Sequence, residues 1–277
     1  MRKIILIDVD ETLTDKNYKL TVSHSVLKAA VARAQTRGYE IGLNSDSSLM
    51  TLQHQAELWG MKGPIIAEKG GVILANIACE PFYTIKEAEY FFTFRKKVVE
   101  RLMDDNKYLV VTGSVNTIAN KLPSYSAVEV LPQVSILINS LRLRSFSCYV
   151  RERVDNKWQT TTRSLDEVVN ILLEIGVENG VECQWNIDKN ILYGICIIHH
   201  RLTEKSIATE QFTVDSDVIY MIGNSMSDYL GDKKIIHCGV ANASSDFKAC
   251  CQFIAKEKRT AGVIELIKKI TEENYNA

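Results

Sequence analysis

The chain has 277 residues, of which 46% are hydrophobic and 24% are charged, and its formal net charge is −1. These proportions are ordinary for a globular protein, and the length allows one large domain or two modest ones. The balanced charge gives no electrostatic reason to expect a nucleic acid or an anionic membrane as partner.

The N-terminal apolar run is too short for a signal peptide and leads directly into acidic residues. No apolar stretch approaches the roughly 18 residues that a membrane span requires. The seven cysteines contain no CxxC pair, which favours reduced, mostly buried thiols in a reducing compartment. We therefore expect a cytoplasmic protein.

The first part of the chain alternates between strand and helix patterns. In chain order, the patterns predict a strand at 4–7, a helix at 24–37, a strand at 39–44, a helix at 48–60, and two short strands around a Gly-Gly turn within 63–74. Gly38 and Gly60 stand where helix C-caps are expected. This alternation is typical of βαβ units and a parallel sheet.

From about residue 80 the pattern changes to that of a separate α+β unit. It predicts helices at 85–105 and 164–180 and strands at 108–115, 145–154, 183–188 and 191–200. Ser164 is the expected N-cap of the second helix, with Glu167 completing a capping box.

From about residue 202 the first rhythm returns. The patterns predict a helix at 204–212, strands within 217–225 and 235–243, and a closing helix at 260–274. We therefore predict an α/β core domain from residues 1–80 and 200–277, interrupted by an inserted α/β cap domain at 81–199.

A cluster of acids follows the first strand. Asp8 comes directly after the apolar run, and Asp10 stands two residues further on. Ligands of open parallel sheets bind beyond the carboxyl ends of the strands, and residues two apart on an extended strand point the same way. Two carboxylates placed together there suggest a divalent cation, or a nucleophile beside an acid–base group.

The spacing Asp8-Val9-Asp10-Glu11-Thr12 resembles the D-x-D-x-T motif of the haloacid dehalogenase (HAD) superfamily of phosphohydrolases. The resemblance implies a Rossmann-like parallel-sheet core with an α+β cap inserted between the second and third motifs. That subclass includes sugar-phosphate, phosphoglycolate and mannosyl-phosphoglycerate phosphatases as well as phosphomannomutase.

Three further motifs of the family can be matched in order. Ser45 follows the strand at 39–44 and corresponds to the phosphate-binding Ser or Thr, with Asn44 and Ser47 as alternatives. Ser45 could instead be the N-cap of the helix at 48–60. Lys205 has the place of the cationic residue at a helix start, although an isolated Lys on a helix is ordinarily a solvated surface residue.

The fourth motif is an acidic loop after the strand that ends in "DVIYMI". Here Asp228 matches the last acid of G-D-x-x-N-D, while Asn224 replaces the first acid and Ser227 replaces the Asn. Asn224 can still offer a carbonyl oxygen to Mg²⁺. The stretches "PIIAEKGGVIL", with Lys69 in place of the usual Asn, and "GVANA" extend the resemblance to both core segments.

The resemblance implies a Mg²⁺-dependent hydrolase of a small phosphate monoester, such as a sugar phosphate or a phosphorylated small acid. Asp8 would be the nucleophile and Asp10 the acid–base group, and Ser45 and Lys205 would hold the phosphoryl oxygens. Asp8, the Asp10 carbonyl and Asp228 would hold Mg²⁺, with Asn224 nearby. A phosphomutase and a non-catalytic ligand-binding protein on the same fold are the alternatives. The sequence leaves open whether the chain forms a homodimer.

The inserted region contains candidates for recognising an anionic or polyhydroxyl leaving group. These are Arg142, Arg144, Arg151, Arg153, His199 and His200. For each of them, however, we expect a solvated charge on a strand face. Trp158 and Trp185 could stack on a sugar or base, but we expect them to pack within the domain.

Overall fold

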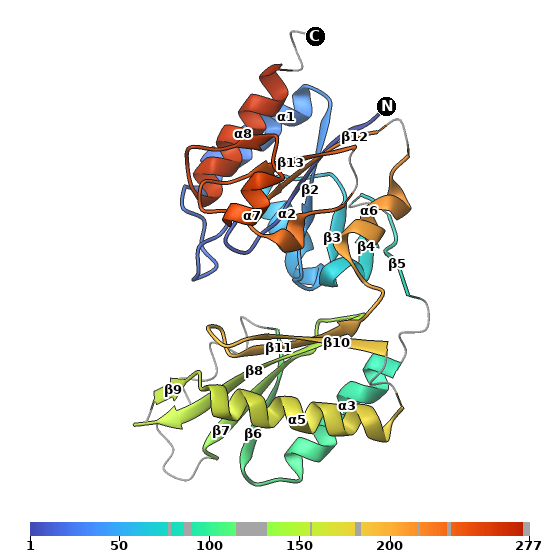
Figure 1. The fold of residues 1–277 in the computed structure, drawn as a ribbon, viewed down its shortest axis with the longest axis vertical. Helices are drawn as coiled ribbons and strands as arrows, with labels where there is room; N and C mark the ends of the chain where they lie inside the picture. The colour runs from blue at the N-terminus through green and yellow to red at the C-terminus, as the bar shows by residue number, and fades with distance from the viewer. Residues whose placement is uncertain are drawn as a thin grey trace. The chain divides into compact units, whose positions relative to one another are not determined.

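The computed structural model describes residues 1–76, 79–85, 90–114, 132–155, 157–180, 184–214, 217–231 and 234–273. The chain forms two compact units (Figure 1). The first unit contains Met1–Thr84 and Thr203–Ala277, and the second contains Ile85–Leu202. None of the described helices combines the length and the apolar composition that crossing a bilayer requires.

The first unit is built on an eight-stranded sheet in the order β14-β13-β12-β1-β2-β3-β4-β5. The strands are β1 (Lys3–Ile7), β2 (Tyr39–Asn44), β3 (Ile65–Ala67), β4 (Val72–Leu74), β5 (Phe82–Tyr83), β12 (Val218–Gly223), β13 (Ile235–Gly239) and β14 (Phe253–Ile254). Neighbours from β14 to β3 are parallel, while β4 and β5 add antiparallel pairs at one edge. The predicted parallel sheet is confirmed.

Helices surround this sheet. They are α1 (His24–Thr36), α2 (Leu49–Trp59), α6 (Lys205–Phe212), α7 (Ser245–Ala249) and α8 (Arg259–Glu273), with short 3₁₀ turns η1 (Glu68–Gly70) and η3 (Met226–Asp228). Ala208 of α6 belongs to the same buried apolar cluster as Ile4 and Leu6 of β1. Gly60 closes α2 in the left-handed conformation, with φ 74°, as the sequence predicts.

The second unit has a sheet in the order β10-β11-β8-β7-β6, with β9 paired to β8. Its elements are α3 (Tyr90–Met103), β6 (Tyr108–Gly113), β7 (Val134–Asn139), β8 (Ser145–Val154), β9 (Lys157–Gln159), α5 (Thr162–Glu178), β10 (Trp185–Asn190) and β11 (Ile195–His200). The predicted helix at 85–105 begins at Tyr90 as far as the structure describes it, since 86–89 lie outside the described residues.

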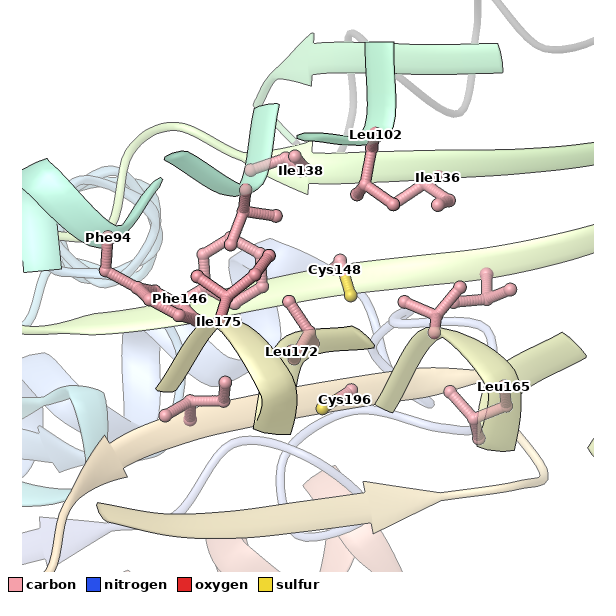
Figure 2. Close-up of a cluster of buried hydrophobic side chains, with 14 of the residues drawn as sticks. Phe94, Leu102, Ile136, Ile138, Phe146, Cys148, Leu165, Leu172, Ile175 and Cys196 are labelled. Atoms are coloured by element: carbon pink, nitrogen blue, oxygen red, sulfur yellow. The ribbon is translucent and has the colours of Figure 1, made fainter. Parts of the chain in front are cut away.

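One face of this second sheet packs against α3 and α5 (Figure 2). Phe146 and Cys148 of β8 and Cys196 of β11 lie among apolar side chains of the two helices. Trp185 belongs to the same core and stacks on Phe91 at a ring-centroid distance of 5.7 Å, as expected for a packing residue. Side chains alternate across a strand, so the neighbours of these core residues face away from the helices.

The predicted start of α5 is wrong. The helix begins at Thr162 with Thr161 as its N-cap, and the Thr161 hydroxyl accepts a hydrogen bond from the Ser164 amide at 3.3 Å. Ser164 lies inside the first turn and donates to a Glu152 oxygen at 2.8 Å. Glu167 contacts Lys107 and Tyr108 and so completes no capping box. Thr161 and Ser164 are both suitable N-cap residues. The contact of Ser164 with Glu152 of β8 leaves Thr161 as the N-cap.

We expect Glu152→Gln to destabilise the second unit by about 1–2 kcal/mol at neutral pH. Hydrogen bonds from Thr161 and Ser164, with help from Arg163, hold the pKa of the Glu152 carboxyl below its usual value. This stabilisation is present above the unfolded-state pKa of about 4.3 and is lost as the pH falls through the lower folded-state pKa. Urea titrations at pH 7 and below pH 4 would measure it. A variant as stable as the wild type at pH 7 would contradict the prediction.

Candidate active site

Three strand ends meet at the carboxyl edge of the first sheet. Ile7 at the end of β1 pairs with Leu43 of β2 on one side and with Ile222 of β12 on the other. The Asp8 amide continues this ladder by donating to the Ile222 carbonyl at 2.9 Å. The residues that follow these strands are therefore brought together, although they are far apart in the sequence.

Asp8 is buried, with 5% of its surface exposed. Its Oδ1 accepts a hydrogen bond from Lys205 Nζ at 3.1 Å, and its Oδ2 accepts one from Thr12 Oγ1 at 2.9 Å. Burial and, after it, the charge of Asp228 raise the pKa of Asp8 to about 8, while Lys205 opposes both. Asp10 lies in the turn after β1 and is exposed, but its charge adds to the pressure on Asp8.

Lys205 joins the two buried carboxylates. It is the first residue of α6, and only 5% of its surface is exposed, which is unusual for a lysine. Its ammonium group contacts Asp8 and, at 2.8 Å, Asp228 Oδ1. Burial lowers the pKa of Lys205, but the charges of Asp228 and Asp8 outweigh it and hold the pKa well above its usual range. The alternative of a solvated surface lysine is therefore wrong, because Lys205 belongs to a buried ion triad.

Backbone amides of the loop that follows β12 hold the Asp228 carboxylate in place. Its Oδ2 accepts hydrogen bonds from the backbone amides of Asn224 and Ser225, at 2.9 and 3.2 Å. Gly223 makes this possible, because a Cβ at that position would lie 2.4 Å from Asp228 Oδ2. Asn224 itself is half-buried next to this carboxylate.

Ser45 follows β2 at the same edge and is buried. Its hydroxyl accepts a hydrogen bond from the Ser47 amide at 3.2 Å. The N-cap of α2 is Ser48, so the alternative role of Ser45 as that cap is wrong. In the described chain, Oδ1 of Asn44 and Oδ1 of Asp46 are buried and have no hydrogen-bond partner.

A clamp that the sequence did not predict fixes the loop after β1. Glu11 has a left-handed backbone, with φ 60°. The Asn242 side chain donates to the Glu11 carbonyl at 2.8 Å and accepts from the Arg259 amide at 3.0 Å. Arg259 Nη2 in turn donates to Glu11 Oε2 at 2.7 Å. The only signal for it was the "GVANA" stretch, which contains Asn242.

The site has an excess of negative charge. Four carboxylates interact electrostatically with Asp8, with Lys205 or with both, and Lys205 supplies the positive charge among them. The four are those of Asp8, Asp10, Asp46 and Asp228. With all four carboxylates ionised, the excess over the one ammonium group would be three negative charges, and the raised pKa of Asp8 lowers this excess at neutral pH. Such a site is suited to a divalent cation and to a group that arrives together with it.

Solved structures share the fold of the chain. A haloacid dehalogenase-like hydrolase from Bacteroides thetaiotaomicron is 15% identical, with a TM-score of 0.67 over 98% of this chain and 100% of that one. A putative HAD/COF-like hydrolase from Plasmodium vivax is 16% identical, with a TM-score of 0.60 over 98% and 96%. BT1666 of Bacteroides thetaiotaomicron, from the phosphatases of the HAD superfamily, is 15% identical, with a TM-score of 0.56 over 97% and 95%.

No protein-family model and no curated protein matches the sequence. The full-length structural matches show that the chain has the fold of the HAD-like hydrolases. Like those structures, which it matches over nearly its full length, the chain combines a mainly parallel sheet with a second, mixed sheet. The predicted fold class is confirmed.

Proposed function

We propose that this protein is a phosphohydrolase that cleaves a small phosphate monoester through a phosphorylated Asp8. The observation that carries the proposal is the buried triad, in which one lysine ammonium group contacts Asp8 at 3.1 Å and Asp228 at 2.8 Å. Keeping these charges out of water is costly unless they act on a ligand. The shared fold supports the same reaction class.

In this proposal Asp8 attacks phosphorus, and Asp10 protonates the leaving oxygen and later removes a proton from the attacking water. The two oxygens of Asp8 are oriented by Lys205 and Thr12, and each keeps a further lone pair. The exposure of Asp10 is consistent with exchange of protons with solvent. Lys205 and the hydroxyl of Ser45 would stabilise the transferring phosphoryl oxygens.

The chemistry of the donor atoms fits a magnesium ion. Asp8, the Asp10 carbonyl, Asp228 and the Asn224 amide offer oxygen atoms, which Mg²⁺ prefers, and the ion commonly keeps several waters. Among the described residues, the buried oxygens of Asn44 and Asp46 at the same edge have no hydrogen-bond partner, which supports a ligand that binds there. When bound, the metal would supply positive charge that lets two anions approach each other.

Phosphate release from a panel of esters tests this function. The panel contains sugar phosphates, phosphoglycolate, nucleoside monophosphates and an aryl phosphate, each with Mg²⁺ and with a chelator. We expect turnover of at least one ester, reduced at least about tenfold by the chelator. No turnover with Mg²⁺, Mn²⁺ or Co²⁺ would contradict the proposal and favour a ligand-binding protein in which Asn224 replaces a metal-binding acid. Conversion to an isomeric monophosphate would favour a mutase.

We expect Asn242→Ala to lower kcat about 10- to 100-fold, because releasing the clamp lets the loop with Asp10 move away from its working position. The KM should change little, since Asn242 contacts Glu11 and Arg259 and no substrate-binding residue of the proposal. Steady-state kinetics at saturating Mg²⁺ would measure both constants. Asn170→Ala, at an exposed position on α5, is the matched control. An equal loss in both variants, or a change in KM alone, would contradict a positioning role.

A further inference from the structure

A buried arginine stands at one end of the second sheet. Arg142 lies in the turn between β7 and β8, and only 4% of its surface is exposed. Its Nε donates to Ser147 Oγ at 2.8 Å and its Nη1 donates to Ser145 Oγ at 2.9 Å. In the part of the chain that the structure describes, no carboxylate pairs with it. The expectation of a solvated strand-face charge is therefore wrong for Arg142, and also for the buried His199 and His200.

The two serines present this arginine on a defined face. Ser145 and Ser147 are fully buried and alternate with Phe146 and Cys148, which face α3 and α5. Arg142 therefore lies against the opposite face of the sheet. His199 on β11 is paired with Ser145, so the cluster is at the end of the sheet from which the chain returns to the first unit.

Among the described residues, the polar groups around Arg142 leave its charge without a counter-charge. The serine hydroxyls are neutral. Asp188 of β10, the strand next to β11, is hydrogen-bonded to His199 Nε2 at 3.0 Å. Arg95 contacts the same turn, since it donates to the Ser140 carbonyl at 3.1 Å. It adds a second positive charge there and so cannot neutralise Arg142. A guanidinium group stays ionised in proteins, and burying it without a counter-charge is costly.

We propose that Arg142, oriented by Ser145 and Ser147, binds an oxyanion, namely a carboxylate or a phosphate group. Two of the five N–H donors of the guanidinium group are used by the serines, and three remain for the planar two-point contact that such anions make. The anion is either a second charged group of the substrate or a separate small anion. Binding of an anion to Arg142 does not depend on the proposed function. Only the assignment of that anion to the substrate rests on the proposed function.

Titration of the wild-type protein with inorganic phosphate or malonate, in the presence of a chelator, tests the binding. The Nε–Hε signal of Arg142 in a ¹H–¹⁵N spectrum should shift and saturate, while that of the exposed Arg101 on α3 should not. Arg142→Lys should weaken this binding at least about tenfold, since a lysine cannot make the planar contact. No saturable shift at Arg142, or an equal shift at Arg101, would overturn the proposal even if no Arg142 variant folds.

Kinetics separate the two sources. If the anion belongs to the substrate, Arg142→Lys raises KM for phosphoglycolate and not for an aryl phosphate with an uncharged leaving group. If the anion is separate, added malonate changes turnover of the aryl phosphate in the wild type and not in Arg142→Lys. Either result supports the site. If no ester is hydrolysed, the phosphatase proposal fails, while the Arg142 titration still decides this one.

Discussion

Asp8→Asn is expected to abolish phosphate release and, at the same time, to stabilise the metal-free protein. The loss follows because an amide cannot act as the nucleophile. The gain follows because Asp8 is buried beside Asp228, so that its negative charge is unfavourable and raises its pKa. Removing that charge should add about 1–2 kcal/mol to the free energy of unfolding, which corresponds to a rise in Tm of about 2–8 °C. Calorimetry with a chelator and phosphate-release assays with Mg²⁺ would measure the two effects.

A suitable control is Asp246→Asn, because Asp246 is an exposed acid of the same unit. It should change neither the Tm nor the turnover. Loss of turnover in Asp8→Asn together with a fall in Tm would show that the variant is misfolded and would leave the nucleophile unproven by this route. Full activity of a well-folded Asp8→Asn protein would contradict the role of Asp8 outright.

The strand ends of the site could be predicted because their signals are local. An apolar run that stops at an acid marks the end of β1, and the same reasoning finds Ser45 and Asn224 after β2 and β12. Parallel strands bring their carboxyl ends to one edge, so the order of motifs was enough to place them together. Lys205 could be identified only from its place in the order of the family motifs. Nothing in the local sequence "TEKSIA" indicates that this lysine is buried.

Features that depend on distant contacts could not be predicted. The ion pair between Glu11 and Arg259 joins residues 248 positions apart. The sequence patterns predict no strand at Val134–Asn139, where the structure has β7, and therefore do not place the turn that contains Arg142. The alternation in "SFSC" was visible, but which face the helices cover is decided by the packing of α3 and α5. The start of α5 was likewise decided by Glu152 on a neighbouring strand.

Lys205→Met should be the most destabilising substitution in the site. It removes the cation that Asp8 and Asp228 share and leaves two buried carboxylates facing each other. Removing one partner of a buried ion pair costs about 3–5 kcal/mol. We expect a loss of that size in urea titrations with a chelator. Lys268→Met, on the exposed side of α8, should be close to neutral.

The double variant Lys205→Met with Asp8→Asn distinguishes charge from packing. If the loss in Lys205→Met arises from unpaired carboxylates, Asp8→Asn should add more stability in the Lys205→Met background than it adds to the wild type. Mg²⁺ should also stabilise Lys205→Met more than it stabilises the double variant, because the metal would replace the missing cation between Asp8 and Asp228. If Asp8→Asn instead adds the same stability in both backgrounds, and Mg²⁺ has no effect, Lys205 only fills space at the start of α6. In that case the buried triad would no longer support a phosphoryl-transfer site.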